Sequence, residues 1–135
     1  MQPGTAGAPI SKRTLRAGEI LSGIAVLFLL FDSIIKVMVI APVEASFTQL
    51  GYPVSVSRGI GLLLLVCLVT YVIPRTSILG AILLTGYLGG AVATHVRVGS
   101  PLFTHVLFPI YVAMLLWGGL LLRDARVRAL IAPRS

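Results

Sequence analysis

Residues 17–40 read AGEILSGIAVLFLLFDSIIKVMVI, and this apolar run decides the fold of the chain. An α-helix rises about 1.5 Å per residue, so roughly 20 residues cross a hydrocarbon core about 30 Å thick. Lipid offers no partners for backbone N–H and C=O groups, and a segment that crosses it must therefore be helical. The run predicts a first transmembrane helix, interrupted by the charged residues Asp32 and Lys36.

The composition extends this interpretation to the whole chain. Hydrophobic residues make up 57% of the 135 residues and charged residues 11%, and the mean hydropathy is +1.01. A soluble domain of this size carries roughly 25% charged residues, so most of the surface must face lipid. The length allows one domain, without room for a separate soluble catalytic module.

Three more apolar runs follow, at residues 53–73, 77–96 and 102–122. Pro42 is expected to end the first helix, and Pro53 suits the first turn of the second helix. Residues 43–52 between them are expected to form a short polar loop. Four spans with short connections predict an all-α fold, an integral membrane antiparallel four-helix bundle. We expect the bundle at residues 15–124, between a disordered leader (residues 1–14) and a basic tail (residues 125–135) that anchors at the membrane surface.

The basic residues predict the orientation of the bundle. With both termini cytoplasmic, the inner side holds most of them, as the positive-inside rule describes. The inner set is Lys12, Arg13, Arg16, Arg75, Arg123, Arg126, Arg128 and Arg134, and the outer set is Lys36, Arg58 and Arg97.

Several functions are disfavoured by the residues that are present. The net charge of +7 suggests nucleic-acid binding, but the basic residues mark the ends of apolar runs and form no phosphate-binding patch, so no nucleic-acid partner is expected. The single cysteine, Cys67, excludes a dithiol mechanism within the chain. With no nucleophile–base pair, phosphate loop or metal-ligand constellation, we predict no catalytic residue and no metal site, and an enzyme acting alone is disfavoured.

The remaining polar residues gather in the outer third of the predicted bundle. Asp32 and Lys36 are four residues apart, the spacing at which side chains meet on one helix face, and a charge at membrane depth costs about 2.5–3.5 kcal/mol. Two interpretations stay open: Asp32 neutralises Lys36 or Arg58 for structural reasons, or the group forms a polar pocket that holds a ligand or moves a proton. The candidate ligand-binding residues are Asp32, Lys36, Arg58, Tyr87, His95, Arg97 and His105.

Two histidines, His95 and His105, fall at similar depth on neighbouring helices. Imidazoles can ligate a haem iron or a metal ion, or hydrogen-bond a quinone carbonyl, and they can also face headgroups or cap a helix. Haem is disfavoured because no acidic second ligand follows at a fixed spacing. Pro109 is expected to kink the fourth helix and to free the carbonyl of His105.

The third span is rich in small residues, including Gly86, Gly89 and Gly90. At this spacing small residues let helices approach closely. We interpret them mainly as packing residues, within the bundle or against a second copy of the chain, with room for a flat ligand near Tyr87 as the alternative.

Several stretches together resemble the DoxX-like family of small four-helix bacterial membrane proteins. They are FDSIIK, GYP, PRTSILGAILLTGYLGGAVATHVRVGSPLF and, after a tryptophan, LRDARVRAL, and the resemblance extends from Arg16 to Pro133. It implies a multi-pass protein of the bacterial inner membrane, in a family whose members are associated with quinone-reducing and oxidative-stress systems. The resemblance transfers no catalytic residue.

Two functions follow as hypotheses. The first is an accessory subunit of a membrane redox system that binds a quinone-like or other lipophilic ligand in an outer-leaflet polar pocket. The second is a structural or partner-docking bundle. The expected partners are the lipid bilayer and either a membrane redox protein or a second copy of the chain, bound through the third helix. A transporter is disfavoured because no inverted repeat or broken helix pair is visible.

Overall fold

The computed structural model describes residues 10–132, and every regular element within them is helical. Four helical segments are long and apolar enough to cross a membrane: Lys12–Met38, Val54–Val72, Pro74–Arg97 and Leu102–Arg123. The predicted all-helical class and the four spans are therefore confirmed. The elements are α1 (Lys12–Met38), α2 (Ala41–Leu50), η1 (Val54–Val56), α3 (Ser57–Val72), η2 (Pro74–Thr76), α4 (Ser77–Arg97), the π-helical turn η3 (Leu102–Val106), α5 (Phe108–Arg123) and α6 (Ala125–Ile131).

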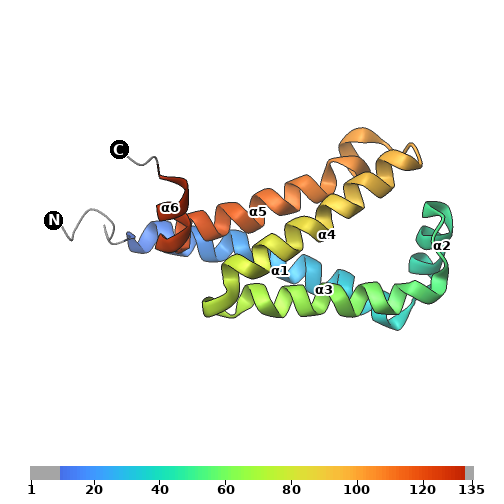
Figure 1. The fold of residues 1–135 in the computed structure, drawn as a ribbon, viewed down its shortest axis with the longest axis horizontal. Helices are drawn as coiled ribbons and strands as arrows, with labels where there is room; N and C mark the ends of the chain where they lie inside the picture. The colour runs from blue at the N-terminus through green and yellow to red at the C-terminus, as the bar shows by residue number, and fades with distance from the viewer. Residues whose placement is uncertain (1–9, 133–135) are drawn as a thin grey trace.

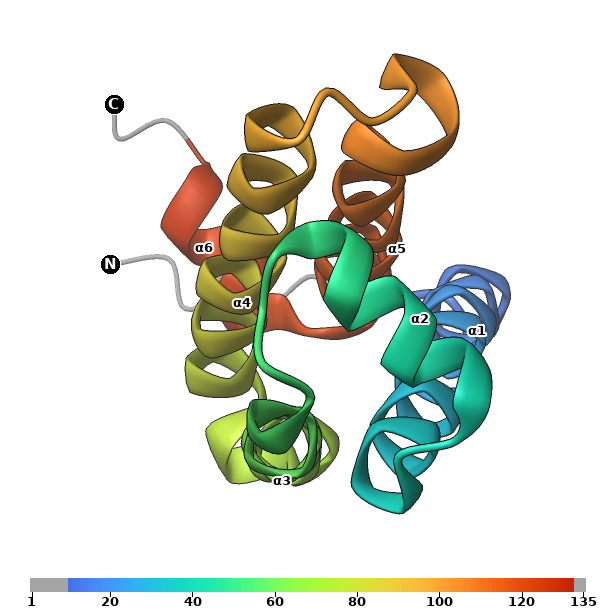
Figure 2. The same cartoon turned by 90° about the vertical axis from the view of Figure 1, so that its right-hand side faces the viewer.

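The two ends of the molecule differ (Figure 1). The start of α1, the α3–α4 turn and α6 lie at one end, which we call the α6 end. The α4–α5 connection and α2 lie at the opposite end, the α2 end. Seen onto the α2 end, α2 runs across the ends of the spanning helices (Figure 2).

Helix α1 begins at Lys12, three residues before the predicted domain start, because Ser11 caps it. The Ser11 hydroxyl accepts a hydrogen bond from the Thr14 N–H at 3.2 Å. Such a cap satisfies one of the free N–H groups of the first turn. The rest of the predicted leader, residues 1–9, lies outside the described part of the chain.

Helix α2 replaces the loop predicted at residues 43–52, so that prediction is wrong. Pro42 stands in the first turn of α2, where a proline has no intrahelical bond to lose. Val43 and Phe47, one turn apart, are buried against the bundle. Gly51, with φ of 79°, ends the helix in the left-handed conformation that glycine adopts most readily.

A buried network holds α1, α3 and α5 together toward the α6 end. Arg123 Nε donates to Ser22 Oγ at 3.0 Å, and the Ser22 and Tyr71 hydroxyls are 2.8 Å apart. Tyr71, with no exposed surface, donates its hydroxyl proton to the Leu116 carbonyl at 2.8 Å. Close backbone contact accompanies this network: a Cβ at Gly119 would overlap Ser22.

Gly86, Gly89 and Gly90 of the third span do not pack helices together within residues 10–132, which corrects their interpretation as packing residues of the bundle; packing against a second copy stays a prediction. A Cβ at Gly86, Gly89 or Gly90 would meet no neighbouring element within 4 Å. The close approach of α3 and α4 occurs instead at Gly80, where a Cβ would overlap the backbone of Tyr71. Helices α3 and α4 are therefore tightly joined near their common turn, and Gly86, Gly89 and Gly90 leave space beside the half of α4 nearer the α2 end.

The fourth span consists of two helical elements. Residues Leu102–Val106 form a π-helical turn that ends in a hydrogen bond of 2.9 Å from the Leu107 N–H to the Leu102 carbonyl. Helix α5 then begins at Phe108, with Pro109 in its first turn. Pro109 thus starts a helix, and His105 belongs to the π turn before it.

The basic tail forms helix α6, which lies against the α3–α4 turn. Arg126 donates to the Pro74 carbonyl at 2.6 Å, and Val127 is buried. Asp124 caps α6 by accepting from the Arg126 N–H at 2.9 Å, and Arg126 holds the pKa of the Asp124 carboxyl below its usual value mainly through a side-chain hydrogen bond. Residues 133–135 of the predicted tail lie outside the described part of the chain.

Candidate functional site: a polar pocket beneath α2

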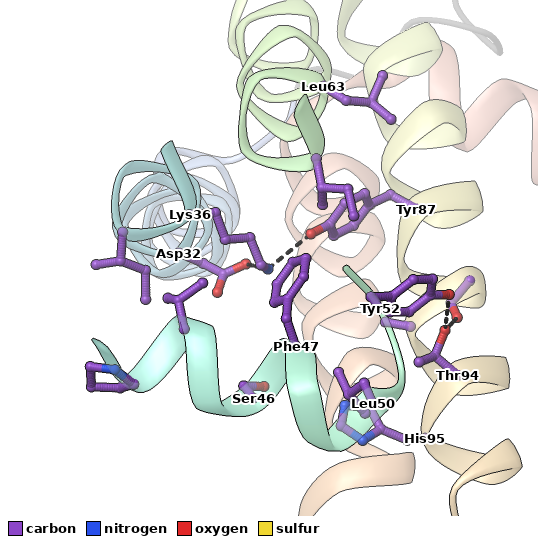
Figure 3. A pocket seen from close by; sticks show the side chains of 16 residues that line it. Asp32, Lys36, Ser46, Phe47, Leu50, Tyr52, Leu63, Tyr87, Thr94 and His95 are labelled. Carbon is purple, nitrogen blue, oxygen red and sulfur yellow. Dashed lines mark hydrogen bonds and ion pairs between the residues drawn. The ribbon is translucent and has the colours of Figure 1, made fainter. Parts of the chain in front are cut away.

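A pocket of about 490 Å³ lies at the α2 end, between α1, α3 and α4, with α2 as its cover (Figure 3). Most of its wall is apolar, and the polar groups come from α1, α2, α4 and the segment after α2. Its lining residues are Asp32, Ile35, Lys36, Pro42, Val43, Ser46, Phe47, Leu50, Tyr52, Ile60, Leu63, Tyr87, Gly90, Ala91, Thr94 and His95.

Packing between α1 and α3 fixes the position of Lys36. A Cβ at Gly61 would lie 2.9 Å from Lys36 Cβ and from the Ser33 carbonyl, so the two helices meet closely here only because residue 61 is glycine. Ser33 Oγ donates to the Gly61 carbonyl at 2.7 Å, and Ser57 Oγ donates to the Lys36 carbonyl at 2.9 Å. Backbone and side chains of two helices therefore hold the lysine at the pocket wall.

The Lys36 ammonium joins α1 to α4 across the pocket. Its Nζ forms an ion pair with Asp32 Oδ2 and donates to the Tyr87 hydroxyl at 3.0 Å. The side chains of Lys36 and Asp32 retain only 18% and 25% of their exposed surface. Asp32 thus neutralises Lys36 and not Arg58, which settles one part of the sequence interpretation.

A second polar group lines the same face of α4. The Tyr52 and Thr94 hydroxyls are 3.0 Å apart, and Thr94 donates to the Gly90 carbonyl at 2.8 Å. Tyr87 and Thr94 are seven residues apart, which places the two polar groups about 10 Å apart along the helix axis. Phe47 points from α2 toward the Lys36–Tyr87 pair in the space between these groups (Figure 3).

Three of the seven predicted ligand-binding residues do not line the pocket. Arg58 is exposed and donates from Nε to the Val37 carbonyl at 3.1 Å. Arg97 donates to the Leu50 carbonyl and lies 6.0 Å from the centre of the Tyr52 ring, so it braces the end of α2. Val37 and Leu50 lie at the carboxyl ends of α1 and α2, where carbonyls lack intrahelical donors and the helix dipole favours a cation.

His105 is the third residue outside the wall, although it contacts a residue within it. The His95 and His105 rings are 5.6 Å apart between centroids, with 66° between their planes. His95 lines the pocket. The structure therefore brings four predicted residues to the cavity: Asp32, Lys36, Tyr87 and His95.

Sequence reasoning missed the contribution of α2 and of the small residues on α4. Phe47 was not predicted as a pocket residue because residues 43–52 were interpreted as a loop. Val43 and Phe47 nevertheless have the four-residue spacing of a helix face. Gly90 was interpreted as a packing residue. One face of a helix carries residues at the spacing of Tyr87, Gly90, Ala91 and Thr94. This periodicity in the sequence could have identified the pocket-lining face of α4.

The pocket combines a largely apolar wall with a few polar side chains. Within residues 10–132, no group of three or more His, Cys, Asp and Glu side chains is placed to hold a metal ion. A mostly apolar cavity with a few converging polar groups is the usual form of a small-molecule site. The pocket can hold an elongated, largely apolar molecule that carries hydrogen-bonding groups.

Comparison with known proteins agrees with the architecture. The model of the DoxX-like family matches residues 20–119, which is most of the chain and includes all four spans in whole or in part. The chain belongs to the DoxX-like family. Neither of two further comparisons, with curated proteins and with solved structures, found a match. Family membership and the four spanning helices identify this DoxX-like protein as a multi-pass membrane protein.

Proposed function

We propose that this DoxX-like protein binds a quinone-like or other lipophilic ligand in the pocket beneath α2, as an accessory subunit of a membrane redox system. The observation that carries the proposal is the Lys36–Tyr87 pair on the wall of a largely apolar cavity of about 490 Å³. The redox context is inferred from the family alone.

The hydrogen-bonding capacity of the pair supports a ligand with a carbonyl or similar acceptor. Tyr87 accepts from Lys36, and within residues 10–132 no acceptor is found for its own hydroxyl proton. An ammonium has three N–H donors, and Lys36 uses two of them, on Asp32 and Tyr87. Two donors therefore remain for a ligand oxygen, and the Asp32 carboxylate keeps the site electrically neutral.

The orientation predicted from the basic residues places this pocket on the outer side. The α6 end carries Arg123, Arg126 and Arg128, so the positive-inside rule assigns it to the cytoplasm. Together with the alternating ends in Figure 1, this supports an antiparallel bundle with both termini cytoplasmic. The pocket then lies in the outer leaflet of the bacterial inner membrane, where a lipophile in the bilayer can reach it past Leu63, which is 56% exposed.

A structural or partner-docking role is the second candidate, and one observation favours it. Within the described residues, every buried side-chain nitrogen and oxygen has a hydrogen-bond partner. A polar group that is fully satisfied can hold helices in one arrangement without any ligand.

Mass spectrometry of the organic extract from gently solubilised protein distinguishes these candidates. We expect a lipophile at near-stoichiometric amount in the wild type and a several-fold lower amount in Tyr87→Phe, which keeps the ring and removes the donor. Tyr111→Phe is the matched control, because Tyr111 is exposed and lies outside the pocket. If the wild type carries no enriched lipophile and Tyr87→Phe only lowers thermal stability, the structural role is correct.

A further inference from the structure

The two histidines of the chain lie side by side at the α2 end, although they come from different elements. His95 stands in the last turns of α4, and His105 stands in the π-helical turn η3. Their ring centroids are 5.6 Å apart. From this pair we infer a binding site for a divalent transition-metal ion of the kind that prefers imidazole nitrogen, such as Cu²⁺ or Zn²⁺. His95 also lines the pocket of the lipophile proposal, but this inference does not depend on the Lys36–Tyr87 pair that carries that proposal.

The separation of the rings fits a shared ion. Zn–N bonds are about 2.0–2.1 Å long and a ring centroid lies roughly 1 Å behind its nitrogen, so two imidazoles on one tetrahedral ion have centroids about 5 Å apart. The observed 5.6 Å exceeds this by a few tenths of an ångström, which a small χ rotation of an exposed side chain supplies. The ring planes are inclined to each other by 66°, in an edge-on arrangement.

The second ring nitrogen of each histidine is already held by a hydroxyl. His95 Nδ1 is 3.0 Å from Ser100 Oγ, and His105 Nδ1 is 2.8 Å from Thr104 Oγ1. When Nδ1–H donates to the hydroxyl, Nε2 is the unprotonated nitrogen and can bind a metal ion, which is the usual outer-shell arrangement in histidine sites. Within residues 10–132 no hydrogen bond is found at either Nε2.

The surroundings favour a cation that arrives from the aqueous side. The carboxyl end of a helix carries partial negative charge, and His95 lies in the last turns of α4. Arg97, the nearest cation in the sequence, is directed to the Leu50 carbonyl and the Tyr52 ring. His105 is exposed, so water can complete the coordination shell. Single π turns recur at functional sites, and this one presents His105.

Metal titration of the purified protein in detergent tests the site. The chain holds only two histidines, so the protein must be purified without a polyhistidine tag. We expect one Cu²⁺ or Zn²⁺ per chain by calorimetry, no binding of Mg²⁺, and a Cu²⁺ electron paramagnetic resonance spectrum with splitting from two nitrogens. His95→Gln and His105→Gln should each weaken binding at least tenfold.

Two further variants keep the outcome unambiguous. Cys67→Ala should bind as the wild type does, because its thiol is buried in α3. Ser100→Ala should weaken binding roughly tenfold by releasing the His95 ring, as loss of an outer-shell partner does elsewhere. Absence of saturable binding, binding that survives the double histidine variant, or half an ion per chain would each overturn an intrachain site.

Discussion

Gly90 offers the most direct test of the pocket, because it forms part of the wall and leaves space beside it. It lies on the face of α4 that also carries Tyr87 and Thr94, and a Cβ there would meet no neighbouring element within 4 Å. Gly90→Leu should therefore fill part of the cavity without a clash. Gly89→Leu is the matched control, since its Cβ also meets nothing within 4 Å and Gly89 is not among the lining residues.

The replacement at Gly90 is expected to lower ligand affinity without lowering the stability of the bundle. A leucine side chain occupies on the order of 100 Å³ in a close-packed interior, about a fifth of the 490 Å³ cavity. Displacing two buried methylenes of a ligand costs about 1.6 kcal/mol at 0.8 kcal/mol each, which corresponds to about a tenfold loss of affinity. Both glycine replacements raise helix propensity by roughly 0.5–1 kcal/mol, so neither should destabilise the bundle.

The assay is the lipophile content of each variant by mass spectrometry, together with its thermal unfolding in detergent. A tenfold loss of affinity lowers the occupancy of a site that is about nine-tenths filled to roughly one half. We therefore expect Gly90→Leu to carry about half the ligand of the wild type with an unchanged or higher Tm, and Gly89→Leu to keep it. Equal ligand content in the two variants would refute the assignment of the cavity as the binding site. A fall in Tm confined to Gly90→Leu would show that the space beside Gly90 is smaller than the structure gives.

Three other changes test the packing and the α6 cap. Gly119→Ala should destabilise the bundle by about 1–3 kcal/mol through overpacking. Gly118→Ala, whose Cβ would make an ordinary 3.8 Å contact, should be neutral or slightly stabilising in an equilibrium unfolding assay. Tyr71→Phe should cost about 1–2 kcal/mol because it leaves a buried carbonyl without its donor; a change within error would show that the network contributes nothing. Asp124 should titrate below its usual pKa in an NMR experiment. A lowered pKa means that the carboxylate form of Asp124 stabilises the fold. This contribution to stability is complete above pH 3.8 and is lost as the pH falls through the lowered pKa. Arg126→Gln should raise that pKa, and an unshifted Asp124 would contradict the observed ion pair.

The polar pocket was predictable in part from spacing along single helices. Asp32 and Lys36 follow from the i, i+4 rule alone, and the structure adds Tyr87 as the partner on another helix. Arg58, Arg97 and His105, which were predicted with them, do not line this cavity. Depth in the membrane can be counted from a helix end, but the direction of a side chain around the bundle depends on which neighbour packs against that helix.

The sequence by itself determined that this chain is helical, has four segments long and apolar enough to cross a membrane, and belongs with its family. These properties depend on the length and mean hydropathy of each run, because lipid is a uniform solvent and transfer into it is a local property of the segment. Only the tertiary structure decided that residues 43–52 form a cover, that Gly61 and Gly80 are the close contacts, and that Gly90 borders a cavity. Between helices there is no water to exclude, so van der Waals fit selects the neighbours, and fit is a property of two surfaces that neither sequence segment encodes alone.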